Sequence, residues 1–469
     1  MKKTKIICTL GPSTEDIEVI RQLVQAGMNC ARLNFSHGTY DQFEKIIKNI
    51  RLVSKETGQP IAIIQDLQGP KIRIGELPQN GVRVTKGEII TIYDGDAYLE
   101  NGDKRLIPIQ YKNFTKDVKK DDIVMIDDGK IELKVLGINI AKTKVDCEVI
   151  TDGVIFSRKG VNAPNTKLSI QAMTEQAHQD LRFGLQIDVD YVALSFVRTP
   201  EDIIDLRKII NKSNRGIQII AKIERPEAME NLVEVVKEAD AIMVARGDLG
   251  IEIPASRVPI AQKLIIKEAN RQGKPVITAT HVLNSMIESP VPTRAEVSDA
   301  ANAIFDHTDA IMLSNETAVG KYPIEATTVL SKVAAEIEEE IEKHNLRTNR
   351  NFTDSLYSAV CLNAVELSED IQAKYVVALT NYGYTAKQMA ERRPKTKIIV
   401  FTPEEKTRNQ LALVWGLNDI YCEKVDFKNP VPKIKAKLEE DRRIESGDEV
   451  VICNSVRGSK QRFISTFLT

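Results

Sequence analysis

The chain has 469 residues, which is too long for one hydrophobic core, so roughly two to four domains are expected. Its 65 Lys and Arg residues nearly balance its 66 Asp and Glu residues, and the net charge of −1 argues against a nucleic-acid groove or a membrane-surface protein. The 42% hydrophobic content, the six scattered cysteines without CxxC pairs and the lack of an apolar run of about 18 residues are typical of a cytoplasmic globular protein with free thiols.

Short apolar segments alternate with amphipathic segments as far as residue 344. Eight strands are predicted at residues 6–10, 30–35, 61–67, 191–197, 217–223, 241–245, 275–280 and 310–314. Helices are predicted at residues 15–25, 40–55, 175–185, 200–210, 227–237, 259–271, 294–305 and 323–344. Eight strands that are each eventually followed by a helix predict an α/β fold, a (β/α)8 TIM barrel.

The third strand is separated from its helix by about a hundred residues, far more than an ordinary βα loop contains. This segment is punctuated by Asn-Gly, Asp-Gly and Lys-Gly turns between short strands predicted at residues 82–85, 88–93, 122–126, 130–136 and 144–150. We therefore predict that residues 71–157 form an inserted small β-barrel domain, placed as a lid on the rim of the larger barrel. The larger barrel then comprises residues 1–70 and 158–346.

The pattern changes again after residue 346. Strands are predicted at residues 375–380, 397–401, 419–422 and 449–453, and helices at residues 354–367, 385–393, 404–413 and 431–440. This alternation predicts a separate C-terminal open α/β domain over residues 347–469.

Charged residues follow two neighbouring strands of the predicted barrel. The strand at 217–223 contains Lys222 and is followed at once by Glu224, and the strand at 241–245 is followed by Asp248. Sites of parallel α/β proteins lie at the carboxyl ends of strands, where two carboxylates would suit Mg²⁺ and Lys222 would add positive charge. The alternative is a surface salt bridge for Lys222 and Glu224 and a turn or N-cap role for Asp248.

Nine motifs, spread over the barrel part of the chain, resemble those of pyruvate kinases in the same order. They are TKIICTLGPST, NCARLNFSHG, QDLQGPKIR, RKGVN, AKIE, MVARGDLGIEIP, KPVITAT, PTRAEVSDAANAIFD and DAIMLSNETAVGKYP. The resemblance extends over the whole chain and implies transfer of the phosphoryl group of phosphoenolpyruvate to ADP, giving pyruvate and ATP, the final step of glycolysis. Such a reaction needs positioning and charge compensation rather than covalent chemistry from the protein.

The resemblance implies a role for each residue around the predicted cation site. Glu224 and Asp248 would hold Mg²⁺ or Mn²⁺, and Lys222 would lie against the phosphoryl group and the enolate oxygen. The backbone amides of Gly247 and Asp248 would bind the carboxylate of the substrate at a helix N-terminus.

The same resemblance implies that Thr280 binds substrate and helps to deliver a proton to the enolate carbon, together with Ser314 and Glu316. For Thr280 the alternative is a strand-terminal residue that caps the next helix. Further catalytic and binding residues are implied at other strand ends, where Arg32 and Arg73 would bind the phosphoryl group.

Arg73 would also contact nucleotide phosphates, with His37 and Lys159. For His37 and Lys159 the alternative is a solvated side chain without a binding role.

A monovalent-cation position is implied by Asn34, Ser36, Asp66 and Leu67. Members of the family that need K⁺ tend to have Glu where this chain has Lys71. A tethered ammonium can supply the charge that the ion would bring, so activity without K⁺ is predicted.

Several positions depart from the family pattern: Arg225 stands where Asn is usual, His281 where Gln is usual, and His307, Asn315 and Asn165 where Gly is usual. No charged catalytic group is lost. Two alternatives stay open: a barrel lyase or aldolase that acts on an enolpyruvate with the same carboxylate pair, and a metabolite-binding regulator that no longer turns over.

The resemblance also implies a homotetramer and a phosphorylated-sugar or nucleotide effector. The effector would bind where residues 380–385 lead from a strand into a helix, near the closing segment SVRGSKQRF.

Overall fold

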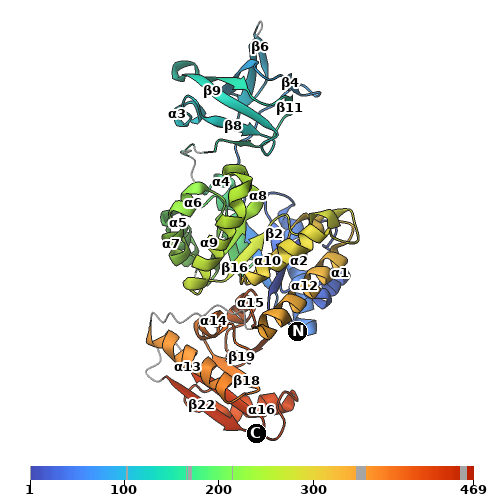
Figure 1. Cartoon of the computed structure of the whole chain (residues 1–469), viewed down its shortest axis with the longest axis vertical. Helices are drawn as coiled ribbons and strands as arrows, with labels where there is room; N and C mark the ends of the chain where they lie inside the picture. Colours follow the sequence, from blue (N-terminus) through green and yellow to red (C-terminus); the bar gives the residue numbers. More distant parts are fainter. Residues whose placement is uncertain are drawn as a thin grey trace.

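A computed structural model of the chain describes residues 2–101, 104–164, 166, 169, 172–213, 215–344, 355–454 and 462–469. Figure 1 shows three units along the long axis: a strand-rich insert at the top, a helix-ringed barrel in the middle and an α/β unit at the bottom. Asn165, the predicted helix start at residue 354, the predicted boundary between residues 346 and 347 and most of the closing segment lie outside the described residues. None of the described helices is long and apolar enough to cross a membrane.

The central unit is a closed barrel of eight parallel strands, in the order β1-β17-β16-β15-β14-β13-β3-β2. Its strands are β1 (Lys5–Leu10), β2 (Cys30–Asn34), β3 (Ala62–Asp66), β13 (Tyr191–Leu194), β14 (Gln218–Ile223), β15 (Ala241–Ala245), β16 (Val276–Ala279) and β17 (Ala310–Leu313). Each overlaps a predicted strand, because strands buried on both faces are continuous apolar runs. The inward side chains fill the barrel together with Ala412 and Leu413 from the C-terminal unit.

A ring of helices covers the outside of the barrel. They are α1 (Ile17–Ala26), α2 (Tyr40–Thr57), α4 (Glu175–Gln186), α5 (Pro200–Asn211), α6 (Pro226–Glu230), α7 (Leu232–Glu238), α8 (Arg246–Glu252), α9 (Val258–Arg271), α10 (Arg294–Phe305), α11 (Asn315–Ala318) and α12 (Pro323–Lys343), with the short 3-10 helices η2 (Ala255–Arg257) and η3 (Asn284–Ile287). The prediction of one helix at 227–237 was wrong. Asn231 interrupts it with φ −103° and ψ 24°, and its side chain donates to the carbonyls of Glu227 (2.9 Å) and Arg198 (3.1 Å).

The insert is a seven-stranded half-barrel in the order β12-β8-β9-β10-β5-β7-β6, beside a two-stranded pair of β11 and β4. Its elements are β4 (Val82–Val84), β5 (Ile89–Asp94), β6 (Leu99–Asn101), β7 (Lys104–Ile109), α3 (Phe114–Asp117), β8 (Ile123–Ile126), β9 (Ile131–Asn139), η1 (Ile140–Lys142), β10 (Lys144–Val149), β11 (Gly153–Ile155) and β12 (Val161–Asn162). Strands β6, β7, β11 and β12 were not predicted, because pairing with distant segments rather than a local alternation of side chains defines them. The insert has its own apolar core.

The C-terminal unit is an open five-stranded sheet in the order β20-β19-β18-β21-β22, parallel except at the edge strand β22. Its elements are α13 (Leu356–Asp370), β18 (Tyr375–Leu379), α14 (Tyr384–Glu391), β19 (Lys397–Thr402), α15 (Glu405–Leu411), β20 (Asp419–Cys422), α16 (Val431–Glu440), β21 (Glu449–Asn454) and β22 (Phe463–Leu468). It packs on the amino ends of the barrel strands. The carboxyl ends face the insert (Figure 1).

Candidate active site

A row of buried charges crosses the carboxyl ends of neighbouring barrel strands. Nζ of Lys222 lies 2.7 Å from Oγ of Ser195, 2.9 Å from Oε1 of Glu224 and 3.2 Å from Oδ1 of Asp66. The other carboxylate oxygen of Asp66 accepts a hydrogen bond from Nε of Arg32 at 2.8 Å. The parallel register of β2, β3, β13 and β14 therefore brings together four of the predicted residues, two cations alternating with two carboxylates.

This row fixes the protonation of its central members. Burial opposes the charged form of Lys222, but Asp66 and Glu224 outweigh it and raise the pKa of that ammonium. Burial also disfavours the carboxylate of Asp66, but Lys222 and Arg32 outweigh it and lower the pKa of Asp66. Lys222 is thus held as a cation beside the ends of the strands.

Glu224 is less well compensated than Asp66. Its Oε2 accepts from the amide of Phe196 at 2.8 Å, whereas Oε1 accepts no hydrogen bond of good geometry among the described residues. Burial raises the pKa of Glu224 to about 7, against the opposing effect of Lys222 and with a further increase from Asp248. A divalent cation would offset this burial, so the residues present fit a hard metal ion with oxygen ligands.

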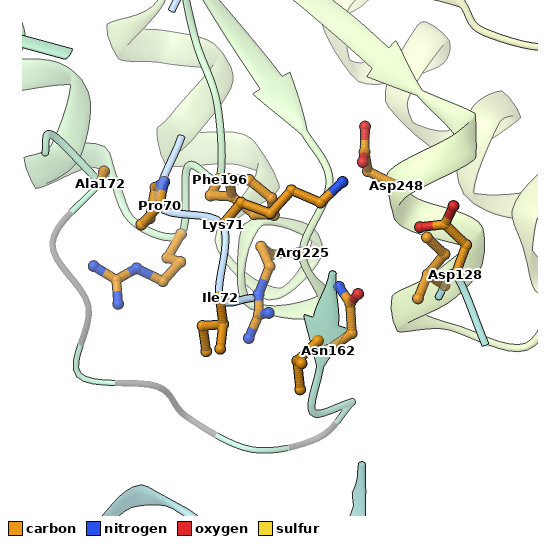
Figure 2. Close-up of a pocket in the computed structure, with 12 residues that line it drawn as sticks. Pro70, Lys71, Ile72, Asp128, Asn162, Ala172, Phe196, Arg225 and Asp248 are labelled. Atoms are coloured by element: carbon orange, nitrogen blue, oxygen red, sulfur yellow. The ribbon is translucent and has the colours of Figure 1, made fainter. Parts of the chain in front are cut away.

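A cavity opens next to these residues, between the barrel and the insert, and Phe196, Arg225 and Asp248 line it from the barrel side. Figure 2 shows Asp248 facing it from the barrel side, Asp128 of the insert close by, and the side chain of Lys71 reaching across toward Asp248. Cε of Lys71 packs over Gly160, where an added Cβ would lie 2.8 Å away. Lys71 therefore lines the cavity at the point where the chain enters and leaves the insert.

Strand β16 ends one residue earlier than predicted because Thr280 and His281 have left-handed backbones, with φ +65° and +53°. For a β-branched residue this conformation costs about 1–2 kcal/mol. Arg246 holds it in place: its guanidinium donates to the carbonyls of Thr280 (2.7 Å) and His281 (3.0 Å) and pairs with Asp299 at 2.5 Å. Arg246 was not among the predicted site residues, although it lies inside the MVARGDLGIEIP motif.

Thr280 meets the start of α8. Its Oγ1 accepts from the amide of Gly247 at 2.7 Å and donates to the carbonyl of Ala279 at 2.7 Å. A Cβ at Gly247 would lie 3.3 Å from that oxygen, so glycine permits the close approach. The amide expected to bind a substrate carboxylate is thus engaged by Thr280 in this structure.

Ser314 and Glu316 lie together at the end of β17. Glu316 is buried, and its two carboxylate oxygens accept from the amides of Leu283 (3.0 Å) and Ser314 (2.7 Å). Oγ of Ser314 is buried without a hydrogen-bond partner among the described residues. Glu316 therefore braces the loop after β16 against the end of β17.

The positions expected to surround a monovalent cation meet at the ends of β2 and β3. Asn34 pairs with Asp66 in the strand register, Oδ1 of Asn34 accepts from the amide of Ser36 at 3.2 Å, and the carbonyl of Leu67 accepts from Ser195 at 3.0 Å. The structure thus brings all four positions together.

The residues expected to contact nucleotide are more scattered. Arg73 donates to the carbonyl of Arg158 at 2.9 Å, and Lys159 pairs with Asp127 at 2.9 Å, so both lie where the chain enters and leaves the insert. His37 is exposed and follows β2. Neither of these two bonds connects Arg73 or Lys159 to the row of buried charges.

A (β/α)8 barrel with a buried ammonium, two carboxylates that fit a divalent cation and a cavity under an inserted domain is an enzyme architecture for anionic substrates. The family model of the pyruvate kinase barrel domain matches residues 1–327, and that of the pyruvate kinase alpha/beta domain matches residues 358–467. The chain therefore belongs to the pyruvate kinase family and is a phosphotransferase.

Individual relatives agree with this assignment. Pyruvate kinase 2 of Synechocystis sp. is 41% identical over 96% of this chain and 76% of its own length. Pyruvate kinase of Clostridium acetobutylicum is 41% identical over 97% of this chain and 96% of its own length. A crystal structure of a pyruvate kinase from Cryptosporidium parvum matches with a TM-score of 0.91 and 34% identity, over 100% of this chain and 96% of that chain.

Proposed function

We propose that the chain transfers the phosphoryl group of phosphoenolpyruvate to ADP at the carboxyl ends of the barrel strands, and that it does so without K⁺. The observation that carries the first part is the buried ammonium of Lys222, held between Asp66 and Glu224, which itself accepts from the amide of Phe196 in the lining of the cavity. A preorganised cation in a site shielded from water stabilises charge that develops on a transferring phosphoryl group and an enolate oxygen.

Glu224 and Asp248 are the residues that would hold Mg²⁺ or Mn²⁺. The ion would supply charge neutralisation for the carboxylate and enolate oxygens of the substrate. Arg32, anchored on Asp66, and Arg73, at the entrance to the insert, bind the phosphoryl group. His37, Arg73 and Lys159 bind the phosphates of the nucleotide.

Thr280 has the best position for the proton that reaches the enolate carbon. Its hydroxyl lies between the amide of Gly247 and the carbonyl of Ala279. A substrate bound by the amides of Gly247 and Asp248 would therefore lie next to it, and a small rotation would turn the hydroxyl toward that substrate. Ser314, whose hydroxyl is unengaged, continues the proton path, and Glu316 keeps Ser314 in place.

The test is pyruvate formation from phosphoenolpyruvate and ADP with Mg²⁺. Lys222→Met should lower kcat by at least about 10²–10³-fold, as for other groups that stabilise transition-state charge. Lys208→Met removes an exposed lysine of α5 and should leave kcat unchanged. A folded wild-type protein that never forms pyruvate would favour the regulator alternative, and product formation without nucleotide would favour the lyase.

Independence from K⁺ rests on Lys71, whose ammonium lies in the cavity near Asp248 (Figure 2). We expect equal activity in sodium and potassium buffers for the wild type, and K⁺-dependent activity for Lys71→Glu. Lys86→Glu, which replaces an exposed lysine of the insert, is the matched control, and its activity should be equal in sodium and potassium buffers. A strict K⁺ requirement in the wild type would refute this part of the proposal alone.

The remaining proposals concern the whole chain. Residues 1–70 and 158–346 are the catalytic domain, apart from β12, which pairs within the insert; residues 71–157 are the lid and 347–469 a regulatory domain, in a cytoplasmic homotetramer. In the turn between β18 and α14, the amide of Gly383 (φ +85°) donates to Oγ1 of Thr380 at 2.9 Å, which supports an anion-binding turn for a phosphorylated sugar or nucleotide.

A further inference from the structure

Arg225 directly follows Glu224, at a position where the family resemblance leads us to expect asparagine. Its side chain is not a solvated surface group, since the residue is only 5% exposed. NH1 pairs with Oε1 of Glu252 at 3.0 Å, and NH2 contacts Oε1 of Glu227 and the carbonyl of Thr166, both at 3.3 Å. A guanidinium with three acceptors is held in one orientation.

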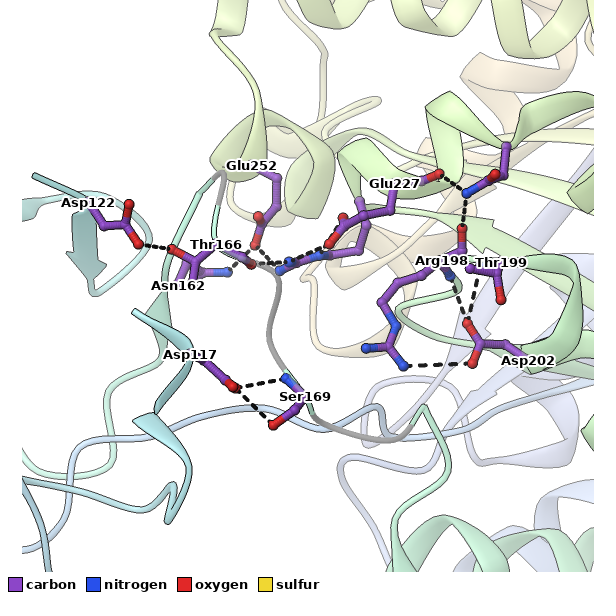
Figure 3. A network of polar contacts seen from close by, with 12 residues as sticks. Asp117, Asp122, Asn162, Thr166, Ser169, Arg198, Thr199, Asp202, Glu227 and Glu252 are labelled. Atoms are coloured by element: carbon purple, nitrogen blue, oxygen red, sulfur yellow. Dashed lines mark hydrogen bonds and ion pairs between the residues drawn. The ribbon is translucent and has the colours of Figure 1, made fainter. Parts of the chain in front are cut away.

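Glu252, at the end of α8, is the main partner of Arg225. It is 3% exposed, and its Oε1 also accepts from Nδ2 of Asn162 at 3.0 Å (Figure 3). Asn162 belongs to β12, which pairs with β8 of the insert. One carboxylate therefore joins the loop after β14, the end of α8 and the segment that returns from the insert.

Helix α8 is thereby held at both ends by arginines. Arg246, at its first residue, is bound to the carbonyls of Thr280 and His281, and Arg225 is bound to Glu252 at its last residue. Seven residues of helix span only about 10 Å, so the helix has little freedom between these attachments. Asp248 lies between them and faces the cavity.

We propose that Arg225 is a positioning residue for the divalent cation: by holding Glu252 it fixes α8, and with it the carboxylate of Asp248, relative to the neighbouring Glu224. The inference rests on the proposed function only for the identity of the cation site. An asparagine at this position is too short to make the same set of contacts. Removal of the guanidinium frees the end of α8 and lets Asp248 move away from Glu224.

The substitution Arg225→Met would also leave Glu252 buried without its cation, which could unfold the region. The double variant Arg225→Met/Glu252→Met removes both charges and keeps the volume filled, so it tests the whole attachment of α8 through Glu252, including the bond to Asn162. Arg225→Lys retains the charge at shorter reach. Arg51→Met is the matched control, because it removes an arginine from another buried carboxylate, Asp190, at the opposite end of the barrel.

The experiment measures Mn²⁺ binding to the full-length protein by electron paramagnetic resonance of the free ion, without substrate or nucleotide. The double variant should bind Mn²⁺ about tenfold or more weakly than the wild type, in the range seen when outer contacts of metal ligands are removed. Arg225→Lys should recover part of the affinity, and Arg51→Met should bind as the wild type does.

Wild-type Mn²⁺ affinity in the double variant, with an unchanged circular dichroism spectrum, would overturn the inference. Equal weakening in Arg51→Met would also overturn it, because the effect would then reflect general loss of stability. Pyruvate formation by the wild type in the same buffer is assayed separately, so failure of the proposed function and failure of this inference are distinguishable.

Discussion

His307 lies between α10 and β17 with a left-handed backbone, φ +67°. Its carbonyl accepts from Asn270 (3.1 Å) and from Arg393 (2.9 Å), so neighbouring elements hold the conformation. Glycine adopts this region without the steric cost that a Cβ brings, so we expect His307→Gly to raise the free energy of unfolding by about 0.5–1 kcal/mol. Urea unfolding would measure the change.

The control for this substitution is His178→Gly, at the fourth residue of α4. There glycine should lower the free energy of unfolding by about 0.3–0.5 kcal/mol, because glycine has a lower helix propensity than histidine. A similar loss in both variants would show that the side chain of His307 matters more than its backbone conformation.

Lys5 introduces a pH dependence of stability. It is buried at the start of β1, where Nζ donates to the carbonyl of Leu417 (2.7 Å) and to Oδ1 of Asn418 (2.5 Å). Burial, with a smaller contribution from Lys2, lowers the pKa of Lys5 from 10.5 to about 7. The folded protein therefore releases this proton at about pH 7, whereas the unfolded chain keeps it until about pH 10.

Between these two values the unfolded state binds more protons, so stability should rise with pH. Relative to Lys5→Met, the wild type should gain up to about 1.4 kcal/mol per pH unit from pH 7 to pH 10, and nothing below pH 7. Lys397→Met, at the exposed start of β19, is the control: its free energy of unfolding should change with pH as that of the wild type does. If the difference in free energy of unfolding between the wild type and Lys5→Met did not change with pH, the low pKa of Lys5 would be contradicted.

Single residues of the site could be predicted only where a local pattern marked them. Lys222, Glu224 and Asp66 stand at the ends of apolar runs, so the barrel topology alone gathers them. Arg225 and Arg246 could not be recognised in the same way, because their main partners are distant in sequence: Glu252 is 27 positions from Arg225, and Thr280 is 34 positions from Arg246. The left-handed conformation of Thr280 was equally hidden, since a β-branched residue locally favours a strand.

At the scale of elements, α10 is tied to the loop after β16 by one carboxylate. Thr293 caps the helix in a capping box with Glu296, and Glu296 also accepts from the amide (2.7 Å) and hydroxyl (2.6 Å) of Ser285 in η3. We expect Thr293→Ala to lower the free energy of unfolding by about 1 kcal/mol, and Glu296→Ala by about 2 kcal/mol or more.

Thr174→Ala, which removes the cap of α4, is the control for these two variants and should resemble Thr293→Ala. Urea unfolding gives the free energies, and hydrogen exchange of the amide of Ser285 gives the local effect. Equal losses for Thr293→Ala and Glu296→Ala would mean that the link to η3 adds nothing.

A helix or strand could be predicted from the sequence where it buries a continuous apolar face. The barrel strands and the strands β18, β19 and β21 of the C-terminal sheet are mostly buried apolar runs that the sequence displays. The break at Asn231 escaped prediction, because the apolar periodicity continues through it while the side chain of Asn231 shares the carbonyl of Glu227 with its own backbone amide. Short strands such as β12 have two residues, too few for any period to appear.

At the scale of the whole molecule, the C-terminal unit closes the amino end of the barrel. Ala412 and Leu413 pack into the barrel interior beside Tyr191, whose hydroxyl donates to the carbonyl of Gln410 at 2.8 Å. The side-chain amide of Gln410 donates to the carbonyls of Asp190 (3.2 Å) and Gly216 (2.8 Å). The interior of the barrel is thus completed by residues of the other unit, which couples the folding of the two.

The expected consequence is that Gln410→Ala partly uncouples the barrel from the C-terminal unit. The carbonyl of Gly216 loses this donor and that of Asp190 keeps only the backbone amide of Gln218, so the variant should lose about 1 kcal/mol of stability. Differential scanning calorimetry should show one transition for both units in the wild type and a broadened or split transition in the variant. Lys433→Met removes an exposed ion pair with Glu423 on the outer face of the C-terminal unit and should leave the transition unchanged. A single sharp transition in Gln410→Ala, shifted no more than in Lys433→Met, would show that the apolar contacts of Ala412 and Leu413 alone hold the two units together.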